Sequence, residues 1–382
     1  MTTTDIDFAA IGFEPGDPAF IADPYPVFHA MRQLGPVLYY PPRGVHLLTR
    51  FEDVNAALRD RRLGRAYLHR YSAEEFGQPA PDRRWPRWTE SERWSLLNLE
   101  PPDHTRLRRL VSAVFTARSV AALRPVVEQL SAAWLDRALT DGRDGNGFDL
   151  IADYAQPYSV AVICTLLGVP REDGALLLGW SHAIVKMYEL HTDLPHQHAA
   201  ECAADEFIDY VRRLIRDRRV HPEPDLISDL IQVADQGDRL TDDEIVCTVI
   251  VLLNAGHEAT VNTLGNGMRA LLTNPDQWHR VLTGAVDPSV AVEEMIRWDG
   301  PLQLFERWVL ADGVEIGGRT LAVCPSSGPG KGFVPGSAER GLDRCPRGNG
   351  GGRAVHSCLG KGSGRVRERC GRGEGHRRRF QA

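Results

Sequence analysis

The residues from Ala255 to Thr260, "AGHEAT", place a glycine and a carboxylate inside a segment that the surrounding pattern predicts to be a long apolar helix. Glycine in a helix interior costs about 1 kcal/mol, and a buried carboxylate costs more. Gly256 beside Glu258 is therefore a local conflict. Such a conflict marks either the close approach of a flat ligand or an ordinary helix pairing.

Hydrogen-bond donors for an anion occur at two distant points of the chain. In "EPPDHTRLRRLV", His104 and Arg108 lie four residues apart on one face of a predicted helix, and both can donate to an anion. The alternative is a solvated basic face shared with Arg106 and Arg109. Arg307 follows an apolar run in "PLQLFERWVLADGVEIGGRTL", which predicts a strand, a turn and a second strand.

One thiol with informative neighbours, Cys358, lies in "RAVHSCLGKG" near the end of the chain. It is either an iron ligand held between His356 and a glycine or a cysteine in a tail that builds no core. Three other cysteines, Cys164, Cys202 and Cys247, fall in helix-like segments and are predicted to be core thiols rather than part of a disulfide framework.

A long central helix must position "AGHEAT". Thr241 followed by Glu244 forms a capping box, and the Asn274-Pro275 pair stops the apolar run. These limits predict a helix of about 32 residues, roughly 48 Å long at 1.5 Å per residue. A helix that long and that apolar must cross the middle of the domain.

The remaining elements define the fold class. Most segments from Asp103 to about Leu230 are predicted helices, and two short strands flank a turn at residues 41–44. Glu294 and Arg297 in "VEEMIRW" are spaced to pair on a further helix. The pattern predicts a mainly α fold with small β elements.

Two segments are predicted to be irregular. Residues 65 to 95 are polar and tryptophan-rich without a clear period, and loops of that length are usually functional. The region around "ELHTDLPHQH" favours a flexible substrate-access loop over a metal site, although it lies near four histidines: His182, His191, His196 and His198.

The composition excludes several classes of function. A net charge of −6 gives no support for a nucleic-acid partner of the whole chain. No continuous apolar run reaches the roughly 18 residues of a membrane span, and the first residues lack the blocks of a signal peptide. We therefore expect a cytoplasmic protein without a membrane or nucleic-acid partner.

In this order and at these separations, the motifs resemble the soluble bacterial branch of the cytochrome P450 family, the haem-thiolate monooxygenases. The resemblance runs from about residue 20 to residue 320 and includes "PPDHTRLRRLV", "AGHEAT" and "EEMIR". It implies that His104 and Arg108 hold one haem propionate and that Arg307 holds the other. It also implies a buried structural pair of Glu294 and Arg297 beneath the haem.

The resemblance further implies the chemistry and its partners. Gly256 would let the long helix pass close over the iron, Glu258 would supply protons to oxygen, and Cys358 would be the axial ligand of haem b. Electrons would come from a ferredoxin and its reductase, since no dinucleotide fingerprint occurs in the chain. The basic face near Arg106 and Arg109 is expected to dock this acidic donor. The expected reaction is hydroxylation or epoxidation of a mid-sized organic molecule with O2.

One position departs from the family pattern at the reaction centre. The family usually has a threonine directly after the acid, where this chain has Ala259, and Thr260 follows one residue later. A shift of one residue turns a side chain by about 100° around the helix, so Thr260 does not simply replace that threonine. Its remaining role is to hold a relay water.

The end of the chain departs more strongly. From Cys324 to Ala382 the 59 residues include 15 glycines and 11 arginines, without isoleucine, methionine, tryptophan or tyrosine. This composition cannot supply the apolar helix that should follow the ligand. We therefore divide the chain into a P450-like domain, residues 1–322, and an aberrant tail, residues 323–382. A frameshift beginning near Val323 in a GC-rich gene is the hypothesis for its origin.

Two alternatives follow from this tail. The first is a non-functional protein with the P450 fold, unable to bind haem correctly because its C-terminal part is incomplete or degraded. The second, from "GRGEGHRRRF", is an Arg/Gly segment that binds RNA with strong salt dependence.

Overall fold

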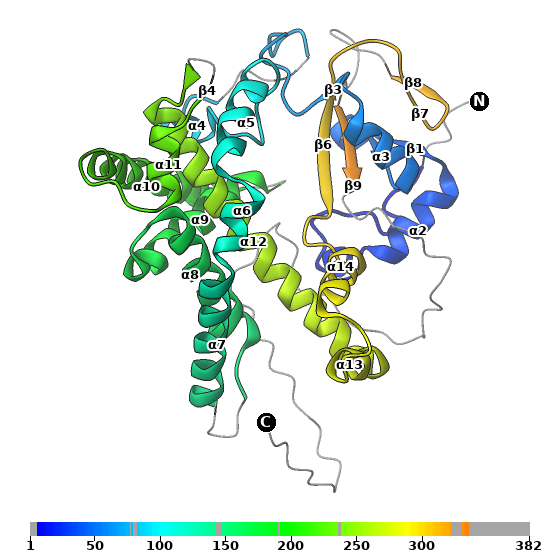
Figure 1. The fold of residues 1–382 in the computed structure, drawn as a ribbon. Coiled ribbons are helices and arrows are strands. Elements are labelled where there is room, and N and C mark those ends of the chain that lie inside the picture. Colours follow the sequence, from blue (N-terminus) through cyan, green and yellow to red (C-terminus); the bar gives the residue numbers. More distant parts are fainter. Residues whose placement is uncertain are drawn as a thin grey trace, which may run out of the picture.

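The computed structural model describes residues 6–76, 78, 82–142, 147–189, 192–235 and 238–321, together with the backbone of a strand at 331–335. Two halves lie side by side in Figure 1, a helical half and a smaller half built around a sheet. The helix α12 (Asp242–Thr273) reaches from one toward the other. The expected mainly α fold with small β elements is confirmed.

The sheet half begins with the N-terminal segment. Its first elements are α1 (Pro18–Ala22), α2 (Tyr25–Leu34), β1 (Val37–Tyr40), β2 (Val45–Leu48) and α3 (Phe51–Arg59). The predicted turn is present, because β1 and β2 pair antiparallel across it and Gly44 has the left-handed φ of 61° that favours glycine. Phe8, Phe13 and Tyr40 pack edge to face in the core beneath.

Five strands form the main sheet in the order β1-β2-β9-β6-β3. Its other members are β3 (Leu63–Gly64), β6 (Leu304–Val309) and β9 (Lys331–Pro335), and a separate hairpin joins β7 (Val314–Ile316) to β8 (Arg319–Leu321). β9 lies between β2 and β6, although it comes from the segment assigned to the tail. The domain boundary at residue 322 stays a prediction.

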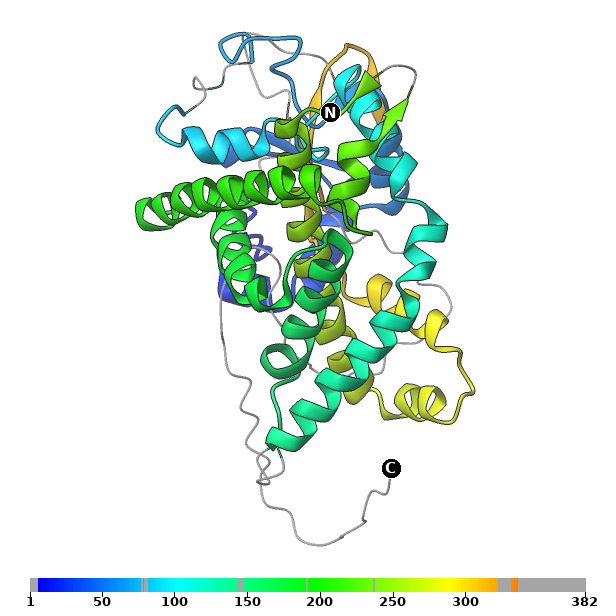
Figure 2. The same cartoon turned by 60° about the vertical axis from the view of Figure 1, so that its left-hand side comes forward.

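The helical half surrounds the first part of α12, as the view in Figure 2 shows. It contains α4 (Pro86–Glu92), α5 (Asp103–Val114), α6 (Ala117–Ala122), α7 (Arg124–Asp141), a π-helix (Leu150–Ala155), α8 (Gln156–Leu167), α9 (Gly174–Val185), α10 (Leu194–Val220) and α11 (Leu226–Gln232). Between α11 and α12 lies a hairpin of β4 (Ala234–Asp235) and β5 (Asp238–Arg239). Beyond α12 follow α13 (Pro275–Leu282) and α14 (Pro288–Trp298).

The predicted limits of the long helix are confirmed. α12 has 32 residues, and Thr241 and Glu244 form the capping box at its start. Nearly every side chain from Glu244 to Asn254 is buried, because this part is surrounded by other helices.

Two expectations about irregular segments were wrong in part. The region 65–95 contains the helix α4, and α10 begins at Leu194, so His196 and His198 lie in a helix rather than in an access loop. Asp193 caps α10 by accepting from the backbone N–H of His196. His191 lies outside the described residues.

Two helical stretches of the described chain, Leu150–Leu167 and α12, are long and apolar enough to cross a membrane by length and composition. Polar residues interrupt both stretches, so neither is a continuous apolar run in the sequence. The buried share of the most apolar window is 67% in α12 and 39% in Leu150–Leu167, so α12 is mostly packed inside the protein.

Candidate functional site

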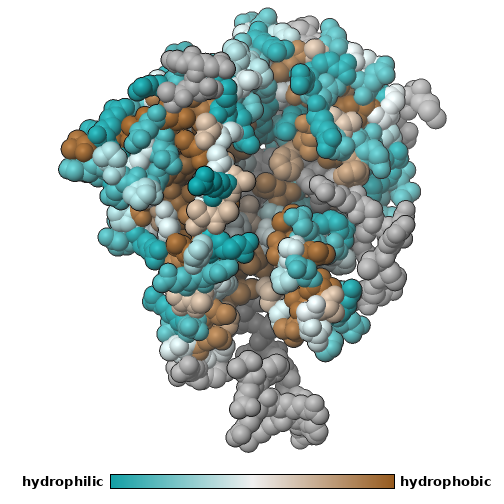
Figure 3. All heavy atoms as spheres, viewed as in Figure 1, coloured by the Kyte–Doolittle hydropathy of each residue, from teal (hydrophilic) through white to brown (hydrophobic). Residues whose placement is uncertain are grey.

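The middle of α12 opens toward solvent on one face. After the buried stretch, Ala255 and Thr260 are exposed and Ala259 is half-buried. Thr260 lies about 100° further around the helix than Ala259, whereas Ala255 and Ala259 are four residues apart and share one side. Their small side chains leave room for a flat ligand against α12. Figure 3 shows hydrophobic residues in a recessed strip where the two halves of the molecule meet.

Gly256 faces a neighbouring helix instead. A Cβ atom added at Gly256 would lie 3.1 Å from Cδ1 of Ile163 in α8, and the Ser159 hydroxyl of α8 donates to the Gly256 carbonyl at 3.3 Å. The structure therefore favours the helix-pairing explanation for this glycine. Ala255 is the open position that sequence reasoning missed, and the change from buried to exposed residues along α12 is what reveals it.

Glu258 points toward α9. Its Oε1 atom lies 3.2 Å from Nε2 of His182, whose side chain is 42% exposed. Burial raises the pKa of Glu258, but the hydrogen bond from His182 and the nearby charges of His257, His182 and Lys186 outweigh it, so the pKa lies below its usual value. The carboxylate is ionised at neutral pH and is held by a histidine that reaches solvent.

His257 completes this group from inside the core. Its Nε2 atom is 3.4 Å from Nε2 of His182, and burial lowers its pKa to about 4. The set of four histidines near residue 190, for which we favoured an access loop over a metal site, does not come together in the described chain. One of its members, His182, instead meets two residues of α12 that are far away in sequence.

The Thr260 hydroxyl donates to the Gly256 carbonyl at 3.0 Å, within its own helix. Its oxygen lone pairs remain free to accept from water. Ala259, at the position of the usual threonine, has no polar atom in its side chain. The predicted relay-water role of Thr260 is compatible with this geometry and stays a prediction.

The strand register brings two arginines together on the sheet side. β3 and β6 pair antiparallel with Gly64 opposite Trp308, so the next residues in register are Arg65 and Arg307. Arg65 Nη1 and Arg307 Nη1 donate to the same carbonyl, that of Glu306, at 3.5 and 2.8 Å. The two cations face each other although like charges across a strand pair are destabilising.

Arg307 is half-buried, whereas Arg65 is an exposed residue of which only the guanidinium end is partly withdrawn from water. Burial lowers the pKa of Arg307, and the charge of Arg65 lowers it further; burial also lowers the pKa of Arg65. Among the described residues, neither side chain forms an ion pair. Two such cations fit an anionic ligand, and the two carboxylates of a haem have the required charge. Sequence reasoning found Arg307 and missed Arg65, because only the register places it here.

His104 and Arg108 lie on α5, as predicted, where His104 is half-buried and Arg108 is exposed. No described contact joins either of them to Arg307. Figure 1 places α5 in the helical half and β6 in the sheet half, so the donors come from both sides of the molecule.

Arg106 and Arg109 are not a free basic face. Arg106 pairs with Glu244 and lies 3.4 Å from Asp238, and Arg109 lies 3.8 Å from the same aspartate. The expectation that these arginines dock an acidic electron donor is not supported, because their charge is already neutralised within the protein.

The predicted pair of Glu294 and Arg297 forms with two hydrogen bonds, of 2.6 and 2.7 Å. The expectation that it is buried was wrong for the described part of the chain, since the Glu294 side chain is 56% exposed. No residue of α14 is buried in the described part of the protein.

The described cysteines provide no ligand near this site. Cys164 and Cys247 are core thiols, as predicted, and burial raises their pKa values to about 11 and 12. Cys202 was predicted to be buried but is exposed, because it lies on the outer face of α10. His356 and Cys358 lie outside the described residues.

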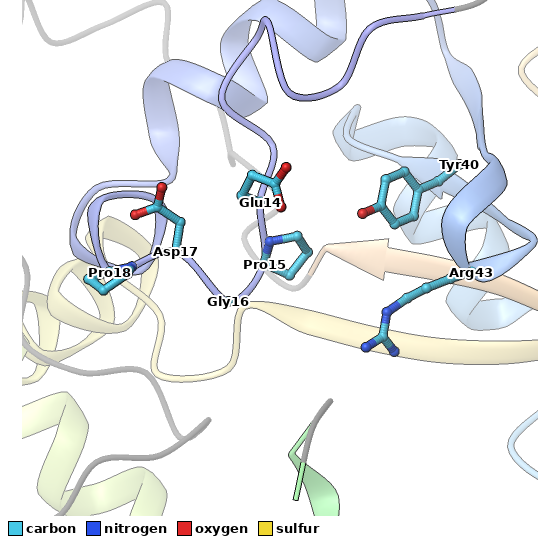
Figure 4. Close-up of a pocket in the computed structure, with 7 residues that line it drawn as sticks. All are labelled: Glu14, Pro15, Gly16, Asp17, Pro18, Tyr40 and Arg43. Carbon is cyan, nitrogen blue, oxygen red and sulfur yellow. The ribbon is translucent and has the colours of Figure 1, made fainter.

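A surface hollow of about 470 Å³ is lined by residues of the N-terminal segment and the β1-β2 turn: Glu14, Pro15, Gly16, Asp17, Pro18, Tyr40 and Arg43. Figure 4 shows these side chains. The hollow contains none of the predicted site residues and no cysteine or histidine, so we do not assign the chemistry to it.

Solved structures define the class of this fold. The chain is similar to CalO2, with a TM-score of 0.74 and 29% identity over 88% of this chain and 80% of that one. It is also similar to the bacillaene polyketide synthase cytochrome P450 PksS of Bacillus subtilis, with a TM-score of 0.71 and 28% identity over 87% of this chain and 80% of that one.

Proteins related in sequence belong to the same class as these structures. The vitamin D(3) 25-hydroxylase of Pseudonocardia autotrophica is 36% identical over 312 residues, 79% of this chain and 71% of the relative. The 6-deoxyerythronolide B hydroxylase of Saccharopolyspora erythraea is 36% identical over 310 residues, 78% of this chain and 72% of the relative. Residues 74–283 match the family model for cytochrome P450. The chain belongs to the cytochrome P450 family of monooxygenases, and haem iron is the cofactor that this membership implies.

Proposed function

We propose that the protein hydroxylates or epoxidises a mid-sized organic molecule, a secondary metabolite of the polyketide kind, with O2 and electrons from a ferredoxin and its reductase. The observation that carries the proposal is the open, small-residue face of α12 beside the Glu258 carboxylate. Names of relatives support the substrate class, since they include a mycinamicin IV hydroxylase/epoxidase and a polyketide biosynthesis cytochrome P450. We place the enzyme in the cytoplasm.

In this proposal haem b binds between α12 and the sheet. Arg307 and Arg65 would hold one propionate, and His104 with Arg108 the other. Ala255 and Ala259 would leave space against α12, while Gly256 keeps that helix close to α8. When bound through a cysteine thiolate, proposed to be Cys358, haem supplies the iron-centred activation of oxygen.

Glu258 is proposed to move protons at the reaction centre. Its Oε1 atom accepts from His182, which positions the carboxylate and connects it to solvent. Thr260 keeps a lone pair for a relay water, while Ala259 leaves the usual hydroxyl position apolar. Proton delivery in this chain thus depends more on Glu258 than on a hydroxyl of α12.

Turnover tests the proposal. The purified chain, reconstituted with haem, ferredoxin and reductase, should oxidise macrolide-type polyketides with consumption of O2. If haem is taken up but none of a broad panel of polyketides, fatty acids and steroids is oxidised, the proposed function is wrong.

A second candidate is a protein with the P450 fold that cannot bind haem correctly. The Gly- and Arg-rich composition of the last 59 residues favours it. Translating the other two frames of the gene after codon 323 tests the frameshift behind this candidate. The frameshift hypothesis requires that one of these frames encodes an aromatic-Gly loop with a cysteine, followed by an amphipathic helix. The hypothesis fails if neither frame does.

A further inference from the structure

Three potential metal-ligating atoms converge between α9 and α12. His182 Nε2, His257 Nε2 and Glu258 Oε1 all lie within 4.8 Å of one another. The two residues of α12 are adjacent in sequence, while the third comes from α9, more than 70 residues earlier in the chain. The packing of α9 on α12 therefore creates this group of three ligands. No local sequence motif predicts it.

The spacing of the three atoms matches one face of a tetrahedron. Zinc binds histidine nitrogen and carboxylate oxygen at about 2.0–2.2 Å, so two ligand atoms of a tetrahedral site are about 3.3–3.5 Å apart. The distances are 3.2 Å from His182 to Glu258, 3.4 Å between the two histidines and 3.8 Å from His257 to Glu258. Only the distance from His257 to Glu258 must shorten, by a few tenths of an ångström.

Burial and charge also suit a cation. The side chain of His257 is 1% exposed and that of Glu258 is 23% exposed, whereas His182 is 42% exposed and provides a path from solvent. Lys186 is the nearby cation, and it is paired with Glu189 at 2.6 Å. The group thus offers one negative charge and two nitrogen ligands, and its His182 side reaches solvent.

We propose that this chain binds one Zn²⁺ or a similar divalent transition metal through His182, His257 and Glu258, linking α9 to α12. The ligand set of two histidines and one carboxylate suits zinc, copper and nickel better than magnesium or calcium, which prefer oxygen ligands. His257 Nδ1 is buried and lacks a hydrogen-bond partner among the described residues, so the second-shell support usual for metal-bound histidines is missing on that side. The affinity should be lower than that of four-ligand structural zinc sites.

The ion would bind the carboxylate to which we assigned proton transfer, so its effect on turnover rests on the proposed function. Metal binding itself does not, because none of the three ligands contacts the arginines assigned to the haem. A binding measurement therefore separates failure of this proposal from failure of the proposed function.

Cobalt(II) is the probe, added to the full chain and followed by absorption spectroscopy. The chain should bind one Co²⁺ with visible bands of tetrahedral geometry and without the near-ultraviolet bands of thiolate ligands. Zn²⁺ should displace it. His182→Gln should weaken this binding by more than the roughly 10- to 100-fold that loss of a supporting hydrogen bond costs a metal site.

Two further variants complete the test. Glu258→Gln should weaken the same signal, whereas His196→Gln should leave it unchanged, because His196 is an exposed histidine that pairs with Asp193 and has no third ligand beside it among the described residues. Circular dichroism checks that each variant is folded.

The proposal is overturned if no tetrahedral Co²⁺ signal appears, or if folded His182→Gln and Glu258→Gln both bind Co²⁺ as the native chain does.

Discussion

At the scale of single residues, Glu258 and Arg65 show what sequence can and cannot reveal. Glu258 could be predicted from sequence because a carboxylate inside an apolar helix is unfavourable, and the neighbouring residues alone show that it lies in such a helix. Arg65 is an ordinary arginine in its own segment. It gains a role only because β3 pairs with β6 and sets it opposite Arg307, and no local pattern contains that register.

The assignment of Glu258 predicts a specific defect. Glu258→Gln keeps the shape of the side chain but removes the titrating group, so product formation should slow and more of the consumed electrons should appear as hydrogen peroxide. The measurement is the ratio of product to peroxide during turnover. Unchanged coupling would remove Glu258 from the mechanism. Ala259→Thr is the complementary variant, and it should leave haem binding intact.

The paired arginines predict an effect on cofactor affinity. Arg65→Ala and Arg307→Ala should each accelerate haem release and weaken haem binding by about 10- to 100-fold, the size of a lost charge-assisted hydrogen bond. Transfer of haem to an excess of apomyoglobin measures this. Arg62→Ala is the matched control, since Arg62 is exposed and pairs with Asp60. Equal release rates in all three variants would contradict the assignment.

His46 predicts a pH dependence of stability. Burial, with a contribution from the charge of Arg319, lowers the pKa of His46 below its unfolded value of about 6.5. The unfolded state therefore takes up the proton first, so the stability that neutral His46 contributes is present above pH 6.5. It is lost as the pH falls toward and through the folded pKa.

Urea unfolding at pH 7.5 and pH 5.5 tests whether the protein loses stability as the pH falls. The native chain should lose more free energy of unfolding between the two values than His46→Phe, which keeps an aromatic ring beside Tyr39. Equal losses in both proteins would show that His46 does not titrate as described.

At the scale of elements, a helix could be predicted accurately when the residues that start and stop it lie within its own segment. The limits of α12 came from its own caps and stop residues, so they could be found to the residue. α4 was missed because its seven residues are too few for a clear period, and it is held by long-range contacts. For example, the backbone N–H of Trp88 donates to Glu201 of α10 at 2.9 Å.

The contact of β3 with its surroundings predicts a strict requirement for glycine. A Cβ atom at Gly64 would lie 2.3 Å from Leu310 Cδ1 and 2.8 Å from Glu100 Oε1, which accepts from the backbone N–H of Arg65. Gly64→Ala should lower the free energy of unfolding by about 1–3 kcal/mol. The control is Gly179→Ala on the open side of α9, which should raise it by up to about 1 kcal/mol. Equal effects, measured by urea unfolding, would contradict this account.

At the scale of the whole molecule, the sheet half and the helical half each contribute part of the proposed haem site. α12 supplies the open face and Glu258, α5 supplies His104 and Arg108, and β3 and β6 place Arg65 and Arg307. Cys358 comes from a part of the chain whose composition differs from everything before residue 323. The proposed reaction therefore depends most on whether Cys358 reaches the iron.

The carbon monoxide spectrum of the reduced, haem-reconstituted protein tests that point most directly. We predict the red-shifted Soret band of a thiolate-ligated iron, and we predict its loss in Cys358→Ser. A histidine-type spectrum, no bound haem, or a thiolate band that persists in Cys358→Ser would contradict the assignment. In the first two cases this chain would be a P450-fold protein without the thiolate centre that the proposed reaction requires.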